Sequence, residues 1–147
     1  MSKLLSLPFF IAAISGVAMA IQGTLNSSLS QKTSLISATL VVHIIGTLVA
    51  LLAVLAWRAP LLKHDWSSVP WYLYLGGILS VIIVGLVAVS IPKVGVCNAT
   101  TAIIIGQVSM AVLIDHFGCF GVSRLPWSPW QLLGIGFFAA GAKLLFR

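Results

Sequence analysis

The sequence predicts an all-α protein whose helices cross a membrane. Of its 147 residues, 60% are hydrophobic and only 7% are charged, whereas a soluble domain carries about 25% charged residues. The hydrophobic residues form five long runs, and roughly 20 such residues in a helix cross a hydrocarbon core of about 30 Å. We therefore expect one domain, residues 1–147, with five transmembrane helices and the two termini on opposite sides of the membrane. The expected helices are Leu4–Leu25, Leu35–Trp57, Trp71–Val89, Ala99–Ile114 and Trp130–Phe146.

The first expected helix begins like a secretory signal, because Lys3 precedes an apolar run that contains small residues. We interpret this run as a transmembrane helix, since no mature soluble domain follows it. Gln22 and Asn26 are four residues apart and lie on one side of the helix. Two interpretations stay open for these amides: they line a solute cavity, or they form hydrogen bonds between helices worth about 1 kcal/mol. A seam for close helix packing adjoins them and consists of Gly16, Ala20, Gly23 and Ser27.

The second expected helix carries His43 as its only ionisable group, with Thr39 and Thr47 four residues to either side. A histidine at membrane depth can bind a ligand, relay a proton or hydrogen-bond to a neighbouring helix, and all three roles stay open. The third expected helix ends near Pro92 and reads as a packing helix, because its small residues permit close backbone approach. These residues are Gly76, Gly77, Ser80 and Gly85.

The fourth expected helix has the most polar groups. Thr100 and Gln107 are seven residues apart and therefore share one face of the helix. Asp115, at the end of the helix, is the only acidic residue near the membrane. We consider it a candidate for coupling or gating; the alternative is that it caps the helix or pairs with a basic loop residue such as Arg124.

The fifth expected helix carries Gly134 and Gly141 one heptad apart, with Ala140 beside them. Small residues at this spacing let two helices approach closely in lipid. Because the seam has no evident polar role, we expect it to form the contact between two copies of the chain.

Several classes of protein are excluded by the motifs that the sequence lacks. It has no zinc-site spacing of Cys and His, no GxxxxGK[ST] loop and no GxGxxG loop. We therefore expect no enzyme activity, no cofactor and no metal. The net charge of +6 comes from basic residues dispersed singly near helix ends. Such residues reach lipid headgroups, so we expect a lipid bilayer around the chain and no nucleic acid as a partner.

Lysine and arginine residues divide evenly between the two membrane faces that five spans define. An excess of these residues in short cytoplasmic loops normally fixes orientation, so an even division leaves insertion weakly biased. A chain that inserts both ways can pair with an inverted copy of itself, and inverted repeats build many secondary transporters. The N-terminal side has Lys3, Arg58, Lys63 and Arg124, and the other side has Lys32, Lys93, Lys143 and Arg147.

Three stretches carry a resemblance to a known family. They are AIQGTLNSSLS from Ala20 to Ser30, GQVSMAVLIDHFGCFGV from Gly106 to Val122, and LLGIGFFAAGAKLL near the C-terminus. Together they resemble the YdcZ-like five-helix family of the drug/metabolite transporter (DMT) superfamily. The resemblance implies a half-size unit of the bacterial inner membrane, which pairs as an antiparallel homodimer or with a sister chain into a ten-helix transporter.

The polar residues narrow what such a transporter would carry. The first helix lacks the membrane-embedded glutamate of the related small multidrug exporters, which argues against a simple cation antiporter. Amide and hydroxyl groups predominate instead, and this composition suits a neutral or zwitterionic small solute. The candidate solute-binding residues are Gln22, Asn26, His43, Thr100 and Gln107. A membrane subunit that stabilises or regulates a partner transporter, without transporting anything itself, is the alternative.

The even charge division predicts that the chain inserts in both orientations in cells. Reporters fused to the C-terminus, one active only in the cytoplasm and one only outside it, are expected to give signal together. Adding two lysines to one loop is expected to leave only one reporter active, because the added charges fix the orientation. A single location for the unmodified chain would contradict dual insertion and favour a parallel or heteromeric assembly.

Overall fold

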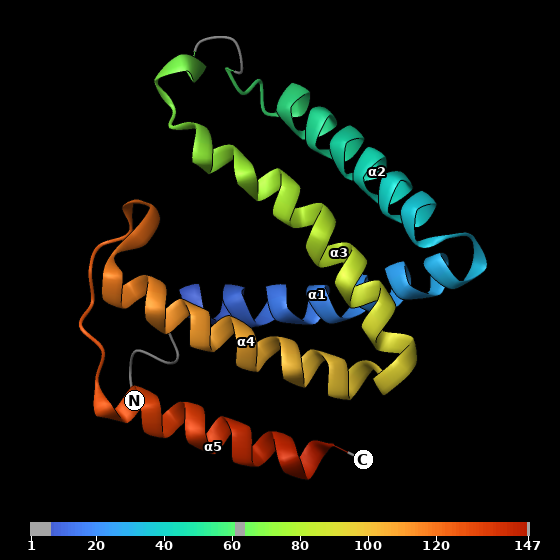
Figure 1. Ribbon diagram of the computed structural model, residues 1–147. Coiled ribbons are helices and arrows are strands. Elements are labelled where there is room, and N and C mark those ends of the chain that lie inside the picture. The colour runs from blue at the N-terminus through green and yellow to red at the C-terminus, as the bar shows by residue number, and fades with distance from the viewer. Residues whose placement is uncertain (1–6, 61–63, 147) are drawn as a thin grey trace. The chain divides into compact units, whose positions relative to one another are not determined.

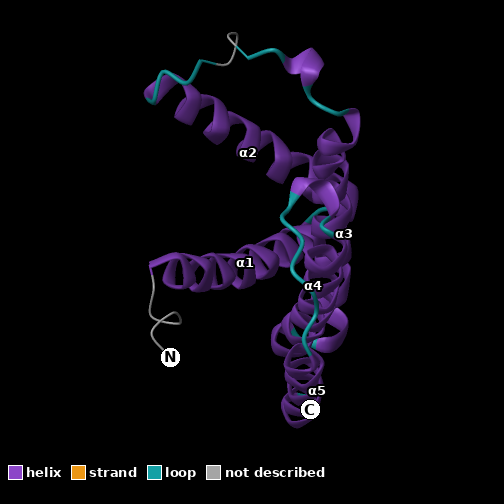
Figure 2. Cartoon of the chain, turned by 90° about the vertical axis from the view of Figure 1, so that its left-hand side faces the viewer, coloured by secondary structure: helices purple, strands orange, loops and turns teal. Residues whose placement is uncertain are grey.

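The computed structural model describes residues 7–60 and 64–146, and these residues fold into five α-helices joined by short connections (Figure 1). No strand occurs in that part of the chain (Figure 2). Two short 3-10 helices, Trp66–Ser68 and Trp71–Tyr74, precede α3, and a third, Cys119–Gly121, follows α4. The α-helices are α1 (Leu7–Lys32), α2 (Leu35–Ala56), α3 (Leu75–Val94), α4 (Val96–Phe117) and α5 (Pro129–Leu145).

Four of these helices are long and apolar enough to cross a membrane: α1, α2, α4, and α3 together with the 3-10 turn before it. The fifth, α5, has 17 residues, which is near the shortest length that crosses a bilayer, about 17 residues. The prediction of an all-α polytopic membrane protein is therefore confirmed. Lys3, Lys63 and Arg147, which entered the charge comparison, lie outside the described residues.

Several helices extend further than their apolar runs. The helix α1 continues to Lys32 rather than ending at Leu25, and α4 begins at Val96 rather than at Ala99. The helix α3 continues past the expected bound Val89, runs through Pro92 and ends at Val94. A proline in the last turn of a helix removes one backbone donor, but the helix can continue past it.

The chain divides into two compact units, Met1–Val89 and Ser90–Arg147. In the first unit α1 contacts α2, and the buried positions lie close to the turn that joins them. Ser34 caps α2, since its side chain accepts a hydrogen bond from the Ser37 backbone N–H at 3.1 Å. The buried residues of α1 are Gly23, Asn26 and Ser27, and those of α2 are Ala38 and Thr39.

The connection between α2 and α3 carries Asp65, which is exposed. Its carboxylate caps the first 3-10 helix by accepting hydrogen bonds from the hydroxyl and the backbone N–H of Ser67. These bonds stabilise the charged form and lower the pKa of Asp65. Asp65 therefore stays ionised and keeps this cap at neutral pH, and the cap weakens only as the pH falls through the lowered pKa.

In the second unit α4 contacts α5, and a loop of residues 118–128 folds against the end of α4. The Leu125 N–H donates to the Asp115 carbonyl at 2.7 Å, and Arg124 Nε donates to the His116 carbonyl at 2.9 Å. The turn begins at Gly118 with φ 65°, where a Cβ would lie 3.2 Å from the Val122 carbonyl oxygen. Only glycine fits that position without strain.

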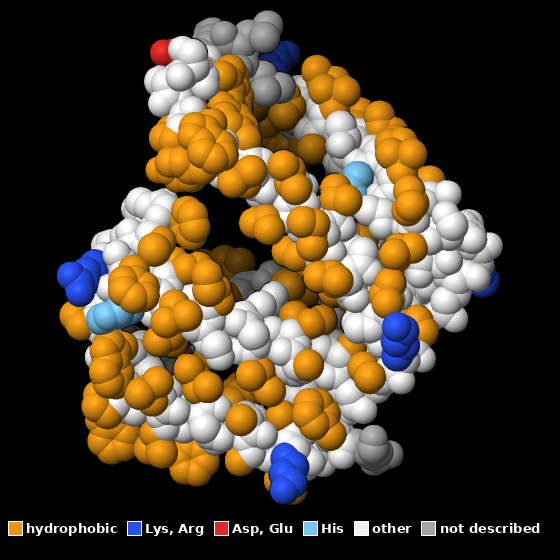
Figure 3. Space-filling model, in the orientation of Figure 1, with side chains coloured by type: hydrophobic (Ala, Val, Ile, Leu, Met, Phe, Trp, Pro, Cys, Tyr) orange, Lys and Arg blue, Asp and Glu red, His pale blue; other side chains and the backbone are white. Residues whose placement is uncertain are grey.

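The helices bury little of their own surface. In the apolar stretch of each candidate span, only 6% to 11% is buried inside the protein. Hydrophobic side chains cover much of the face that Figure 3 shows. In a bilayer, lipid tails and the helices of other proteins cover such side chains without any cost.

Candidate functional site

A histidine joins two helices of the first unit. His43 on α2 is half-buried, with Nδ1 2.7 Å from the Thr39 carbonyl oxygen and Nε2 3.1 Å from Ser80 Oγ on α3. A carbonyl oxygen can only accept, so Nδ1 carries the hydrogen of the first bond. In the neutral ring Nε2 then accepts from the Ser80 hydroxyl. Of the roles left open for His43, the hydrogen bond to a neighbouring helix is therefore realised.

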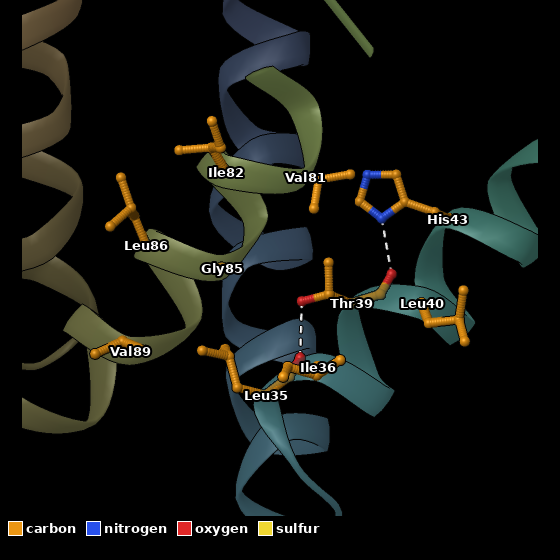
Figure 4. Close-up of a pocket in the computed structure, with 10 residues that line it drawn as sticks. All are labelled: Leu35, Ile36, Thr39, Leu40, His43, Val81, Ile82, Gly85, Leu86 and Val89. Atoms are coloured by element: carbon orange, nitrogen blue, oxygen red, sulfur yellow. Dashed lines mark hydrogen bonds between the residues drawn. The ribbon is translucent and has the colours of Figure 1, made fainter. Parts of the chain in front are cut away.

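The same two helices form the walls of an open pocket of about 600 Å³ (Figure 4). Its walls are apolar apart from Thr39 and His43, and the Thr39 hydroxyl donates to the Leu35 carbonyl of its own helix at 2.8 Å. Gly85 forms part of the α3 wall, where an added Cβ would meet nothing within 4 Å. The lining residues are Leu35, Ile36, Thr39, Leu40 and His43 from α2, and Val81, Ile82, Gly85, Leu86 and Val89 from α3.

Of the solute-binding candidates, His43 is the one that lines this pocket. Sequence reasoning missed its partner, because Ser80 was interpreted as one of several small packing residues. A signal was present, since Ser80 is the only hydroxyl side chain between Leu75 and Val89. A lone polar group in the middle of an apolar helix needs a partner, and a histidine on the preceding helix is a suitable one.

The two amides of α1 differ in their surroundings. Asn26 is buried, with 8% of its surface exposed, whereas Gln22 is exposed. Neither amide forms a hydrogen bond with any other residue in the described part of the chain. Because no fully buried side-chain nitrogen or oxygen there lacks a partner, the amide atoms of Asn26 are not completely enclosed. The Asn26 amide is therefore available to a group that the chain itself does not supply.

The candidates on α4 lie along one helix of the second unit. Thr100 and Asp115 are half-buried, and Gln107 is exposed. Arg124 donates to the His116 carbonyl, and the Asp115 carboxylate forms no ion pair or hydrogen bond with the residues at positions 7–60 and 64–146. Asp115 also lies in the last turn of α4, where the helix dipole disfavours a negative charge. The alternative in which Asp115 pairs with Arg124 is thus not seen.

Two of the glycines of α5 line a second cavity, of about 390 Å³, between α4 and α5. Gly134 and Gly141 contribute to it together with Thr101 and Ile104 of α4. An added Cβ at either glycine would meet nothing within 4 Å. The space beside this seam is therefore open within the chain.

The family described as "Putative inner membrane exporter, YdcZ" matches residues 7–144. The chain belongs to the YdcZ family. No curated protein and no solved structure matches it.

Membership of the YdcZ family confirms the resemblance seen in the sequence. It also supports a transporter role rather than an enzymatic one. Together with the apolar helices, it makes the chain a multi-pass protein of the bacterial inner membrane.

The His43–Ser80 bond predicts a measurable contribution to stability. In Ser80→Ala the Nε2 atom loses its donor, and the free energy of unfolding is expected to fall by about 0.6 to 2 kcal/mol. Thermal unfolding of the purified protein in detergent measures the change. Ser15→Ala is the matched control, because the Ser15 hydroxyl bonds only to the Ala12 carbonyl of its own helix. Equal effects of the two substitutions would contradict a bridging role for Ser80.

Proposed function

We propose that this YdcZ family member is half of a secondary transporter that exports a small metabolite or drug-like solute by alternating access. The observation that carries the proposal is the family match over residues 7–144. Polar side chains at membrane depth support it, because such groups are costly in lipid and usually mark a solute or ion pathway. Buried Asn26 and half-buried His43 are of this kind.

The working assembly we propose is an antiparallel homodimer, or a pair with a sister chain. Two inverted five-helix units provide the inverted repeat on which many transporters are built, and rocking of one against the other exposes the solute to alternate faces. The even division of lysine and arginine supports this arrangement. So does the open seam at Gly134 and Gly141, since small residues beside empty space permit a second helix to approach closely.

We propose a coupling or gating role for Asp115. Its half-buried carboxylate has no partner among the described residues and lies against the unfavourable end of the α4 dipole. A carboxylate in that position gains from a cation or a basic group brought to it during transport. Thr100, one of the solute-binding candidates, lies near the other end of the same helix.

The amides provide the test of transport. We propose that Gln22, Asn26 and Gln107 hydrogen-bond the solute, because each amide offers donors and an acceptor. Gln107→Leu and Asn26→Leu are expected to weaken solute binding by about 1 to 3 kcal/mol, the cost of one lost hydrogen bond. Uptake into vesicles containing the purified protein measures this, after a thermal-shift screen has identified a solute. Val108→Leu, next to Gln107 on the same helix, is the control.

The same experiment separates transport from its alternative, a non-transporting subunit that stabilises or regulates a partner. In that alternative the amides only hold helices together. Gln107→Leu and Asn26→Leu would then lower thermal stability and leave the rate and affinity of transport by the complete assembly unchanged. That outcome would favour the subunit role.

The glycine seam of α5 predicts a dimer contact. Gly141→Leu is expected to lower the dimer fraction severalfold, because the bulky side chain keeps the partner helix at a distance. Chemical crosslinking and light scattering in detergent measure the fraction. Gly136→Leu is the matched control, since Gly136 lies in the same helix, also in open space, and does not line the α4–α5 cavity. An unchanged dimer fraction for Gly141→Leu would remove this seam from the interface.

A further inference from the structure

The pocket between α2 and α3 has the size and lining of a small-molecule site. Its volume of about 600 Å³ falls within the usual range for such sites, about 300 to 1,000 Å³. Such sites are mainly apolar with a few placed polar groups, and here those groups are Thr39 and His43. All lining residues lie in the unit Met1–Val89.

The polar groups of the lining are already engaged within the chain. The Thr39 hydroxyl donates to the Leu35 carbonyl, and both ring nitrogens of His43 have partners, the Thr39 carbonyl and the Ser80 hydroxyl. A charged or strongly polar ligand would find no free donor on these walls and would lose its hydration. The lining therefore selects an apolar ligand, and the expectation of a hydrogen-bonded solute does not describe this part of the protein.

We propose that this pocket binds the apolar body of the exported solute, which makes the substrate class a neutral molecule that is mainly hydrocarbon or aromatic. This inference rests on the proposed function and names the substrate class. His43 and Ser80 act as positioning residues, because their bond sets the distance between the α2 and α3 walls. Gly85 keeps the pocket open on the α3 side, since any larger side chain there would project into it.

Two other occupants fit the pocket less well. A transmembrane helix, about 10 Å across, could lie only against the open side of this pocket and could not fill it. A lipid tail would form no hydrogen bond with the imidazole of His43 or the hydroxyl of Ser80, which join the two walls. Lipid occupancy is nevertheless an outcome that the experiment distinguishes.

The test is binding of the neutral aromatic probe N-phenyl-1-naphthylamine to the full-length protein in lipid nanodiscs, followed by energy transfer from the tryptophans. Empty nanodiscs give the background from probe dissolved in lipid. We expect saturable binding to the unmodified protein. Through the series Gly85→Ala, Gly85→Val and Gly85→Leu the affinity is expected to fall in order of side-chain size, by about tenfold or more for leucine, because the pocket is progressively filled.

Gly76→Leu is the matched control. Gly76 lies nine residues before Gly85 on α3, about two and a half turns away and so on the opposite side of the helix, and its Cβ position is also open. Its probe affinity is expected to stay within about twofold of the unmodified protein. The small Gly85→Ala change preserves helical structure, so the series remains informative if the leucine variant fails to fold.

The inference is overturned if binding is not saturable, as for a pocket held by lipid, or if the Gly85 series binds the probe as tightly as Gly76→Leu does. If the proposed transport function is wrong, the result differs from both of these outcomes. In that case no solute accumulates in vesicles, while the graded loss of probe binding in the Gly85 series persists. Transport of an identified solute that is insensitive to Gly85→Leu would instead keep the proposed function and reject this pocket as its site.

Discussion

The hydrocarbon core of the membrane requires every backbone N–H and C=O group to find a partner inside the protein, and this requirement governs the whole chain. A helix meets it within a single segment, so the chain forms helices wherever its sequence is apolar enough to enter lipid. Because lipid tails are as apolar as leucine, burial of side chains does not drive these helices together. The small buried share of each span follows from that. The residues buried near the turn between α1 and α2 are instead small or polar ones, such as Asn26, Ser27 and Thr39.

Most hydroxyl groups in the spans serve their own helix. Thr24, Thr39 and Thr101 each donate to the carbonyl four residues earlier, which satisfies the hydroxyl without engaging another element. Ser80 behaves differently, because its hydroxyl reaches His43 on another helix. The amides of Gln22 and Gln107 and the carboxylate of Asp115 have no partner among the described residues. The polar groups of the spans therefore divide into those satisfied locally and those left available, and the second group holds the candidates for function.

The sequence predicted the helices better than the contacts between them. Hydropathy identifies a span because length and composition are local properties, whereas the helix ends in polar segments, such as Lys32 in α1 and Val94 in α3, depend on backbone bonds that hydropathy does not report. The face of His43 could be assigned from the 3.6-residue period, but its pairing with Ser80 depends on how α2 and α3 are rotated about their axes. The apolar pocket beside this pair was missed for the same reason: its walls consist of leucine, isoleucine and valine residues that look like any lipid-facing surface.

The strength of the His43–Ser80 bond bears on how such a pocket can release its contents. A hydrogen bond between transmembrane helices contributes about 1 kcal/mol, which favours the joined state over the separated one by only about fivefold. At the solute site that we propose, a bridge of this strength costs little to break, and an apolar solute held by contact alone would lose its affinity when the walls separate. A charged solute bound by a buried ion pair would need a much larger energy to leave. A weakly bridged apolar pocket thus suits a transporter, because the site must bind its solute on one side of the membrane and release it on the other.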